Sequence, residues 1–185
     1  MSRVRAVDRA ARALRDGGVV AYPTESVFGL GCDPFDPEAV ARILSIKRRR
    51  VDNGLILLAA AVEQLDAYIC PAPAERERML ASWPGPVTWV VTATPGVPAW
   101  ITGGRSSVAV RVTAEPVAAA LCRAADMAIV STSANRSGRP PARSTLQTRR
   151  RFASVVDEIL PGAVGGYSRP TEIRLASTGD VLRAA

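Results

Sequence analysis

Apolar residues recur along the chain in two spacings that alternate. Short continuous apolar runs indicate buried strands, and apolar residues three and four positions apart indicate amphipathic helices. In "FDPEAVARILSIK" the helical signals are complete, because Asp36 can cap the N-terminus, Pro37 suits the first helical position and Glu38 favours the first turn. The pattern predicts helices at 6–15, 35–47, 115–125 and 144–153, two short helical stretches around 71–80, and strands at 19–24, 55–60, 86–94, 107–112, 127–133, 172–175 and 180–183.

Helices interleaved with apolar strands predict the α/β class, with a twisted, mostly mixed or parallel open sheet flanked by helices. The chain has no internal repeat and no linker long enough to divide domains, so we expect one domain over residues 1–185. In open α/β sheets, ligands bind beyond the ends of the strands. The polar clusters that follow the strands are therefore the candidate sites.

The composition restricts the possible functions mainly because the chain has no histidine. Apolar residues make up 48% and charged residues 22%, as in globular proteins, and the longest apolar run, Leu55 to Val62, is too short to span a bilayer. The N-terminal segment has no signal-peptide core, and Cys32, Cys70 and Cys122 form no CxxC pair, so we expect a cytoplasmic location. The chain has no histidine. A Ser-His-Asp triad, a Cys-His pair and a His-ligated metal are thereby excluded, and hydroxyls, carboxylates, amides and cations must carry any chemistry.

One basic cluster contains the only lysine among 24 basic residues, in a chain of net charge +7. That charge suits a nucleotide or nucleic-acid partner, but a plain preference for arginine would also produce it. Lys47 to Arg50 close the helix expected at 35–47. The helix dipole, worth ~0.3–1 kcal/mol per cation, accounts for one or two of these charges but not for four. Lys47 and Arg49 would face one cleft if the helix ended between them, and together they would hold a polyphosphate. We expect Arg48 and Arg50 to be solvated or to assist a polyanion nearby.

Other polar clusters each have a simpler alternative. Residues 22–33 place hydroxyls beside glycines, which suits a small polar ligand or an ordinary turn. Residues 129–141 end a buried strand in hydroxyls and an amide, with the same two interpretations. Arg111 interrupts an apolar strand, so it either meets an anion or faces water from an edge strand. Arg183 has the same ambiguity, and the basic run at 147–152 is either a solvated helix face or a weak RNA contact.

Six segments in this order carry a resemblance to a known family: "YPTESVFGLGCD", "KRRRVDNGLILLA", "WPGPVTWV", "SSVAVRVT", "VSTSANRSGRPP" and "RPTEIR…GDVLR". They resemble the TsaC/YrdC family of threonylcarbamoyl-AMP synthases, from about residue 7 to residue 183, and the short single-domain type in particular. The resemblance implies a YrdC-like fold, which is a twisted mixed α/β sheet with a concave, positively charged cleft.

The resemblance also implies a reaction. The family makes L-threonylcarbamoyl-adenylate and pyrophosphate from L-threonine, bicarbonate or CO2, and ATP, and the product feeds the t6A modification of tRNAs that read codons beginning with A. Mg²⁺ is expected on the ATP phosphates, with Glu25, Asp33 or Asp52 as candidate helpers. Positioning and charge neutralisation dominate such a nucleotidyl transfer, which suits a site without histidine. Weak tRNA binding and a downstream threonylcarbamoyl transferase that accepts the product are expected partners, and a membrane is not.

The family motifs, carried over residue by residue, imply two groups of contacts. Lys47 and Arg49 match the K-x-R positions that contact ATP phosphates and are the candidate catalytic pair. The implied ATP-binding residues are Lys47, Arg49, Asn53, Ser133, Asn135 and Arg183. The implied threonine-binding residues are Thr24, Ser26, Arg111, Ser131 and Thr171, with Arg111 as the partner of the threonine carboxylate. The motifs assign no metal ligand.

Several positions depart from the commoner family pattern. Arg50 replaces a proline, Asn53-Gly54 replaces a Lys/Asn-Pro pair, Glu172 replaces a threonine, and Leu58 stands where many members have a histidine. Any threonine contact from that histidine is lost here. A different class of function also remains open, namely a non-catalytic module that binds tRNA or double-stranded RNA through its basic runs. ATP turnover separates the two hypotheses.

Overall fold

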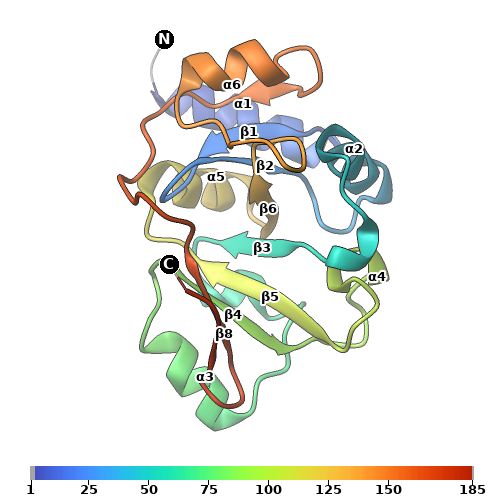
Figure 1. Cartoon of the computed structure of the whole chain (residues 1–185), viewed down its shortest axis with the longest axis vertical. Helices are drawn as coiled ribbons and strands as arrows, with labels where there is room; N and C mark the ends of the chain where they lie inside the picture. Colours follow the sequence, from blue (N-terminus) through green and yellow to red (C-terminus); the bar gives the residue numbers. More distant parts are fainter. Residues whose placement is uncertain (1–2, 185) are drawn as a thin grey trace.

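The computed structural model describes residues 3–184, and within them nine strands form one sheet in the order β7-β1-β2-β6-β3-β5-β4-β8-β9 (Figure 1). The strands are β1 (Val20–Pro23), β2 (Phe28–Gly31), β3 (Ile56–Ala59), β4 (Val87–Thr92), β5 (Ser107–Val112), β6 (Ile129–Ser133), β7 (Glu158–Ile159), β8 (Glu172–Leu175) and β9 (Val181–Arg183). The helices are α1 (Arg3–Arg15), α2 (Pro37–Lys47), α3 (Pro73–Leu80), α4 (Ala99–Thr102), α5 (Pro116–Ala125) and α6 (Thr145–Phe152), with the 3-10 turns η1 (Val51–Asn53) and η2 (Val62–Leu65). The predicted single domain includes residues 1, 2 and 185, which lie outside the described part.

The sheet is mixed, as the sequence predicts, although antiparallel pairs are the more numerous. Neighbouring strands are parallel in the pairs β1–β7, β3–β5 and β4–β8, and antiparallel in the other five. Short connections explain part of this, because β1–β2 and β8–β9 are consecutive strands joined by tight turns, which allow only antiparallel pairing. The predicted α/β class is confirmed.

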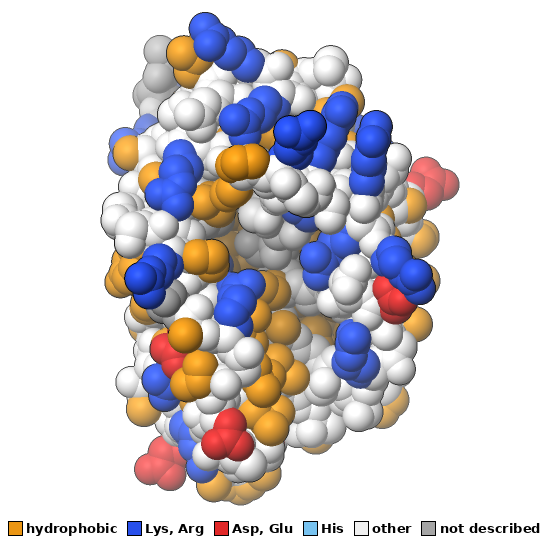
Figure 2. Space-filling view, in the orientation of Figure 1, with side chains coloured by type: hydrophobic (Ala, Val, Ile, Leu, Met, Phe, Trp, Pro, Cys, Tyr) orange, Lys and Arg blue, Asp and Glu red, His pale blue; other side chains and the backbone are white. Residues whose placement is uncertain are grey.

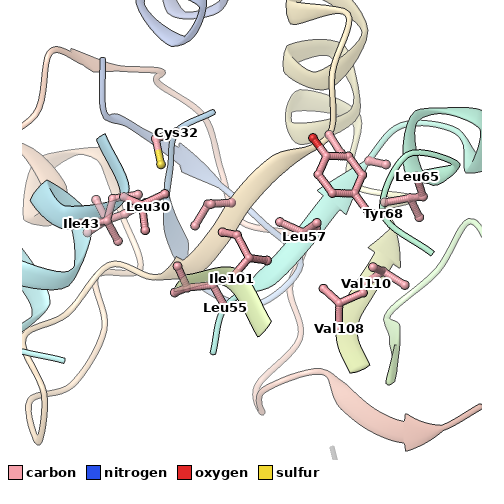
Figure 3. Close-up of a cluster of buried hydrophobic side chains, with 14 of the residues drawn as sticks. Leu30, Cys32, Ile43, Leu55, Leu57, Leu65, Tyr68, Ile101, Val108 and Val110 are labelled. Carbon is pink, nitrogen blue, oxygen red and sulfur yellow. The ribbon is translucent and has the colours of Figure 1, made fainter. Parts of the chain in front are cut away.

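Helices cover the two faces of the sheet unequally. Alternation along a strand sends Leu57 to one face and Leu58 to the other. Leu57 belongs to a cluster that takes in Ile43 of α2 and Ile101 of α4, as Figure 3 shows. Leu58 packs with the side chains of α1 and α5, including Leu121. Because α1 and α5 pack mainly on β1, β3 and β7, the part of this second face over β5, β4 and β8 is left without a helix (Figure 1).

The strand β2 was not predicted, because its glycines resemble a loop. Gly29 and Gly31 lie beside the ring of Tyr22 in β1, and a Cβ on Gly31 would come within 2.8 Å of that ring and 2.5 Å of the Val130 carbonyl. Glycine in a strand often marks such a close approach. The two-residue strand β7 and the single turns α4 and η1 were also missed, since elements this short carry little periodic signal.

The predicted N-cap of α2 is confirmed and gives a test of local stability. One side-chain oxygen of Asp36 accepts hydrogen bonds from the backbone N–H groups of Glu38 (2.9 Å) and Ala39 (3.0 Å). We expect Asp36→Ala to lower the free energy of unfolding by ~1 kcal/mol, because those N–H groups lose their acceptor. Urea denaturation measures the change. Glu77→Ala, on the exposed side of α3, is the control and should change stability by less than ~0.5 kcal/mol; equal effects would contradict the cap.

Candidate functional site

An open cleft of about 750 Å³ lies on the sheet face that α1 and α5 leave uncovered (Figure 2). Its floor is a row of mostly small side chains from neighbouring strands. Gly29 of β2 pairs with Ser133 of β6, and Ile56 of β3 pairs with both Ser131 of β6 and Ala109 of β5. These strands come from distant parts of the sequence, so the sheet order itself assembles the site.

The cleft is strongly basic. Among the described residues that line it there is no Asp or Glu, and five arginines do so: Arg49, Arg105, Arg111, Arg143 and Arg183. Figure 2 shows lysine and arginine side chains around the hollow. This is the position and charge expected for the concave basic surface. Arg105 and Arg143 were not predicted, because they lie in loops where one more arginine carries no pattern.

A buried ion pair stands at one end of the cleft. Arg111 is 5% exposed and donates from Nη2 to Glu25 Oε2 at 3.1 Å, while the Thr113 hydroxyl donates to Glu25 Oε1 at 2.6 Å. Arg111 Nη1 donates to the hydroxyls of Thr88 (2.9 Å) and Thr171 (2.8 Å). Three described residues thus hold the guanidinium directly, and a fourth, Thr113, holds Glu25. The alternative of Arg111 on an edge strand is wrong, because β5 lies between β3 and β4.

One N–H of this guanidinium is left over. Arg111 Nε is buried and has no hydrogen-bond partner among the described residues. A buried donor without a partner costs about 1–3 kcal/mol. Because Arg111 lines the cleft, a ligand carboxylate that accepted from Nε would remove that cost. The role of Arg111 as a carboxylate partner stays a prediction.

The candidate magnesium helpers are already committed to other partners. Both oxygens of Glu25 accept hydrogen bonds, Asp33 accepts from the Phe35 N–H at 2.8 Å, and Asp52 pairs with Arg50 at 2.7 Å. The described residues contain no group of three or more His, Cys, Asp or Glu side chains that could hold a metal ion. Asp and Glu side chains in the described part of the chain therefore form no cluster of metal ligands.

The four cations of the basic run are placed as expected except for Lys47, which does not line the cleft. Helix α2 ends at Lys47. Its C-cap, Arg48, has a left-handed backbone (φ 51°) and is exposed, as is Arg50. Lys47 is only 4% exposed, and Arg49 lines the cleft. Arg49 Nη2 donates to the Gly54 carbonyl at 3.0 Å, while its Nε has no partner among the described residues. Burial lowers the pKa of Arg49.

Lys47 lies behind the cleft wall and holds a loop. Its ammonium donates to the Ser133 carbonyl, to the Asn135 carbonyl at 3.2 Å and to Asn135 Oδ1 at 3.0 Å. The Ser133 hydroxyl, on the cleft side, donates to Asn135 Oδ1 at 2.6 Å. Burial, with help from the nearby charge of Arg49, lowers the pKa of Lys47 to about 8. Lys47 therefore shapes the wall from which Ser133 faces the cleft.

The structure places the remaining predicted residues as follows. Arg183 Nη2 donates to the Thr171 carbonyl at 2.7 Å, and burial followed by repulsion from Arg111 lowers the Arg183 pKa. Of the predicted set, the cleft lining includes Thr24, Ser26, Arg49, Asn53, Arg111, Ser131, Ser133, Thr171 and Arg183. Lys47 and Asn135 do not line it and instead support it. Glu25 and Thr113, which orient Arg111, were missed because their contact spans about ninety residues.

The structure shows what surrounds the residues that depart from the family pattern. Leu58 is fully buried in the core beneath α1 and α5, so it contributes packing and no polar group to the cleft. Glu172 pairs with Arg174 at 2.5 Å, and Arg50 pairs with Asp52. Gly54 adopts φ 63° and lies close to the backbone of Ile101.

Comparisons with known proteins agree on one family. A family model described as "Telomere recombination" (Sua5/YciO/YrdC) matches residues 12–185. Two similar relatives, both called threonylcarbamoyl-AMP synthase, are from Alkalilimnicola ehrlichii (58% identical, covering 96% of this chain and 95% of that protein) and Halorhodospira halophila (56% identical, covering 96% and 93%).

Solved structures give the same result. The crystal structure of P. abyssi Sua5 complexed with L-threonine superposes with a TM-score of 0.90 at 34% identity over 99% of this chain. This chain spans about half of that protein, 54% of its length. E. coli YciO superposes with a TM-score of 0.85 at 26% identity, covering 97% of this chain and 89% of that one.

The Arg111–Glu25 pair gives a stability prediction. Glu25→Ala leaves a buried guanidinium without its counter-charge, and we expect it to lower the free energy of unfolding by ~3–5 kcal/mol. Asp52→Ala is the matched control, because it removes the partner of the exposed Arg50 and should cost no more than ~1 kcal/mol. Urea denaturation of both variants at pH 7 measures the difference. Equal losses would show that burial of the pair is unimportant.

Proposed function

The chain belongs to the Sua5/YciO/YrdC family, and we propose from that premise that it is an enzyme, a threonylcarbamoyl-AMP synthase. Its substrates are L-threonine, bicarbonate or CO2, and ATP, and its products are threonylcarbamoyl-adenylate and pyrophosphate. The observation that carries the proposal is the single basic cleft that brings together nine of the residues predicted to bind the substrates. The two relatives called threonylcarbamoyl-AMP synthase, which match this chain over nearly its full length, support the proposal.

We propose that the reaction is a nucleotidyl transfer. The threonine amine and CO2 form a carbamate, and a carbamate oxygen attacks the α-phosphorus of ATP. A new P–O bond forms as the bond to the β-phosphate oxygen breaks, and pyrophosphate leaves. Positioned cations lower the cost of the charge on the leaving group, and no histidine is needed. Arg49, Arg105 and Arg143 are the cleft cations available for this role. Mg²⁺ brought with ATP would supply further charge neutralisation.

The amino-acid end of the cleft is assigned to Arg111 and its neighbours. The free Nε–H of Arg111 binds the threonine carboxylate, and Glu25 keeps the guanidinium in place from below. Thr24, Ser26 and Ser131 provide the nearby hydroxyl groups. Relatives support this end of the assignment, since P. abyssi Sua5 has been crystallised with L-threonine.

The nucleotide end is assigned to Arg49, Asn53, Ser133 and Arg183, which line the cleft. Lys47 contributes in two ways. It holds the Ser133–Asn135 loop, and it adds a positive charge close beneath the phosphates. Direct contact would require a phosphate oxygen to replace one of the oxygens that the ammonium now holds. The cleft, at about 750 Å³, is within the size range of small-molecule sites.

Partners outside the cleft complete the proposal. The product passes to a transferase that modifies tRNA, and weak tRNA binding accompanies it. We place the enzyme in the cytoplasm; none of the described helices is long and apolar enough to cross a membrane. The alternative, an RNA-binding module without catalysis, predicts salt-sensitive RNA binding and no turnover.

Pyrophosphate release tests the proposal. The protein with ATP, L-threonine and bicarbonate should release pyrophosphate that depends on all three, and Arg49→Gln should lower kcat/KM for ATP by ~10²-fold or more, because a cleft cation is lost. Arg48→Gln is the matched control, one residue away and turned to solvent, and should retain activity within about twofold. Release without threonine, or none at all, would overturn the proposed activity.

The lowered pKa of Lys47 predicts a pH dependence. The ammonium is charged below its pKa of about 8 and neutral above it. At saturating threonine and bicarbonate, kcat/KM for ATP should therefore fall above pH 8, by up to about tenfold per pH unit. Lys47→Arg should be less active but show no such fall between pH 7 and about 9.5, because arginine stays charged. The ratio of the two profiles removes the effect of pH on the substrates; a constant ratio would contradict the role of this charge.

A further inference from the structure

A second hollow, of about 450 Å³, shares no lining residue with the cleft. We call it the arginine pocket, and it is lined by Asn135, Arg136, Arg139, Pro140, Arg151 and Phe152. The loop after β6 supplies four of these residues, and α6 supplies the other two. The basic run on α6 had no assigned role beyond a solvated face or a weak RNA contact.

Hydrogen bonds hold the walls of the arginine pocket in place. Asn135 Nδ2 donates to the Arg136 carbonyl at 3.1 Å and the Arg139 carbonyl at 2.8 Å, which closes the loop into a compact turn. Arg151 Nη1 donates to the Pro140 carbonyl at 2.9 Å and ties the loop to α6. Phe152 is 3% exposed and belongs to the core. The pocket is therefore formed before any ligand arrives.

The charges around this pocket are uncompensated. Arg136 and Arg139 make no ion pair or side-chain hydrogen bond with any described residue, and the lining contains no Asp or Glu. Arg151 uses one N–H and keeps its full charge. Three arginines line one hollow, and their like charges repel one another unless an anion lies between them. A guanidinium presents a planar fork of donors that fits phosphate oxygens.

We propose that the arginine pocket binds a small, multiply charged phosphate anion of the pyrophosphate or short polyphosphate class. A compact hollow with three cations around it fits a compact polyanion better than a nucleic-acid backbone, which would follow an extended basic stripe. The pocket also adjoins the cleft wall. The 2.6 Å hydrogen bond between Ser133, which faces the cleft, and Asn135, which faces the pocket, links the two. The proposal does not depend on the enzymatic activity proposed above.

Calorimetric titration with inorganic pyrophosphate tests the proposal. The cleft binds anions too, so the variants must separate the sites. Arg136→Gln/Arg139→Gln removes two charges from the pocket, and Arg149→Gln/Arg150→Gln removes two exposed charges from α6 that do not line it. We expect the native protein to show two binding events. The pocket variant should lose one of them, by at least about tenfold in affinity, and the control should keep both within about twofold.

Three results would overturn the proposal. One is an equal loss of pyrophosphate affinity in the pocket variant and the control, which would mean that binding depends only on the net charge of the protein. Another is a single binding event in the native protein that Arg49→Gln removes and the pocket variant does not. The third is unchanged pyrophosphate binding in the pocket variant together with weakened binding of a short RNA duplex, which would make this a nucleic-acid surface. Thermal melting of each variant confirms that all remain folded.

Discussion

The site depends on one buried ion pair, Arg111 with Glu25, in the middle of the sheet. A buried guanidinium and carboxylate are costly to desolvate, and they persist only when their other hydrogen bonds are satisfied. Three threonines do most of this here, because Thr88 and Thr171 accept from Arg111 and Thr113 donates to Glu25, while Arg111 Nε keeps no partner among the described residues. These residues come from β4, β5 and the segments beside β1 and β8. The pair and its threonines therefore join segments that lie far apart in the sequence.

Around that pair, one set of side chains faces the cleft, and a second set behind it holds the first in place. Arg49, Ser133 and Arg111 face the cleft, while Lys47, Asn135 and Glu25 lie behind them. The supporting groups are charged or fully hydrogen-bonded, so the cleft is preorganised without a metal or a histidine. The same logic accounts for the small residues of the floor. A side chain at Gly29, which lines the cleft, would press on Thr24 and on the ring of Tyr22.

Much of this could be predicted from the sequence, and the exceptions have physical causes. Long periodic segments gave α2, α5 and the central strands, and the N-cap at Asp36 was visible in three consecutive residues. The exposure of Arg48 and Arg50 and the cleft position of Arg49 followed from helix geometry, whereas the burial of Lys47 behind the cleft wall did not. In contrast, β2 was not predicted because its glycines make room for the neighbouring Tyr22 ring. Glu25 was considered only as one candidate helper of Mg²⁺, because its partner Arg111 lies far along the chain. Both features depend on contacts between separate segments of the chain, so a short stretch of sequence cannot reveal them.

The single lysine has a practical consequence for studying motion. An amine-reactive reagent has one side-chain target in this chain, and that target is almost completely shielded by Ser133 and Asn135. A side chain in this state can react only when the loop opens, because the ammonium must leave its acceptors, lose a proton and reach solvent. The rate at which Lys47 is labelled therefore reports how often the cleft wall opens. Labelling of the native chain therefore reports on the motion of the segment that separates the two arginine-lined hollows.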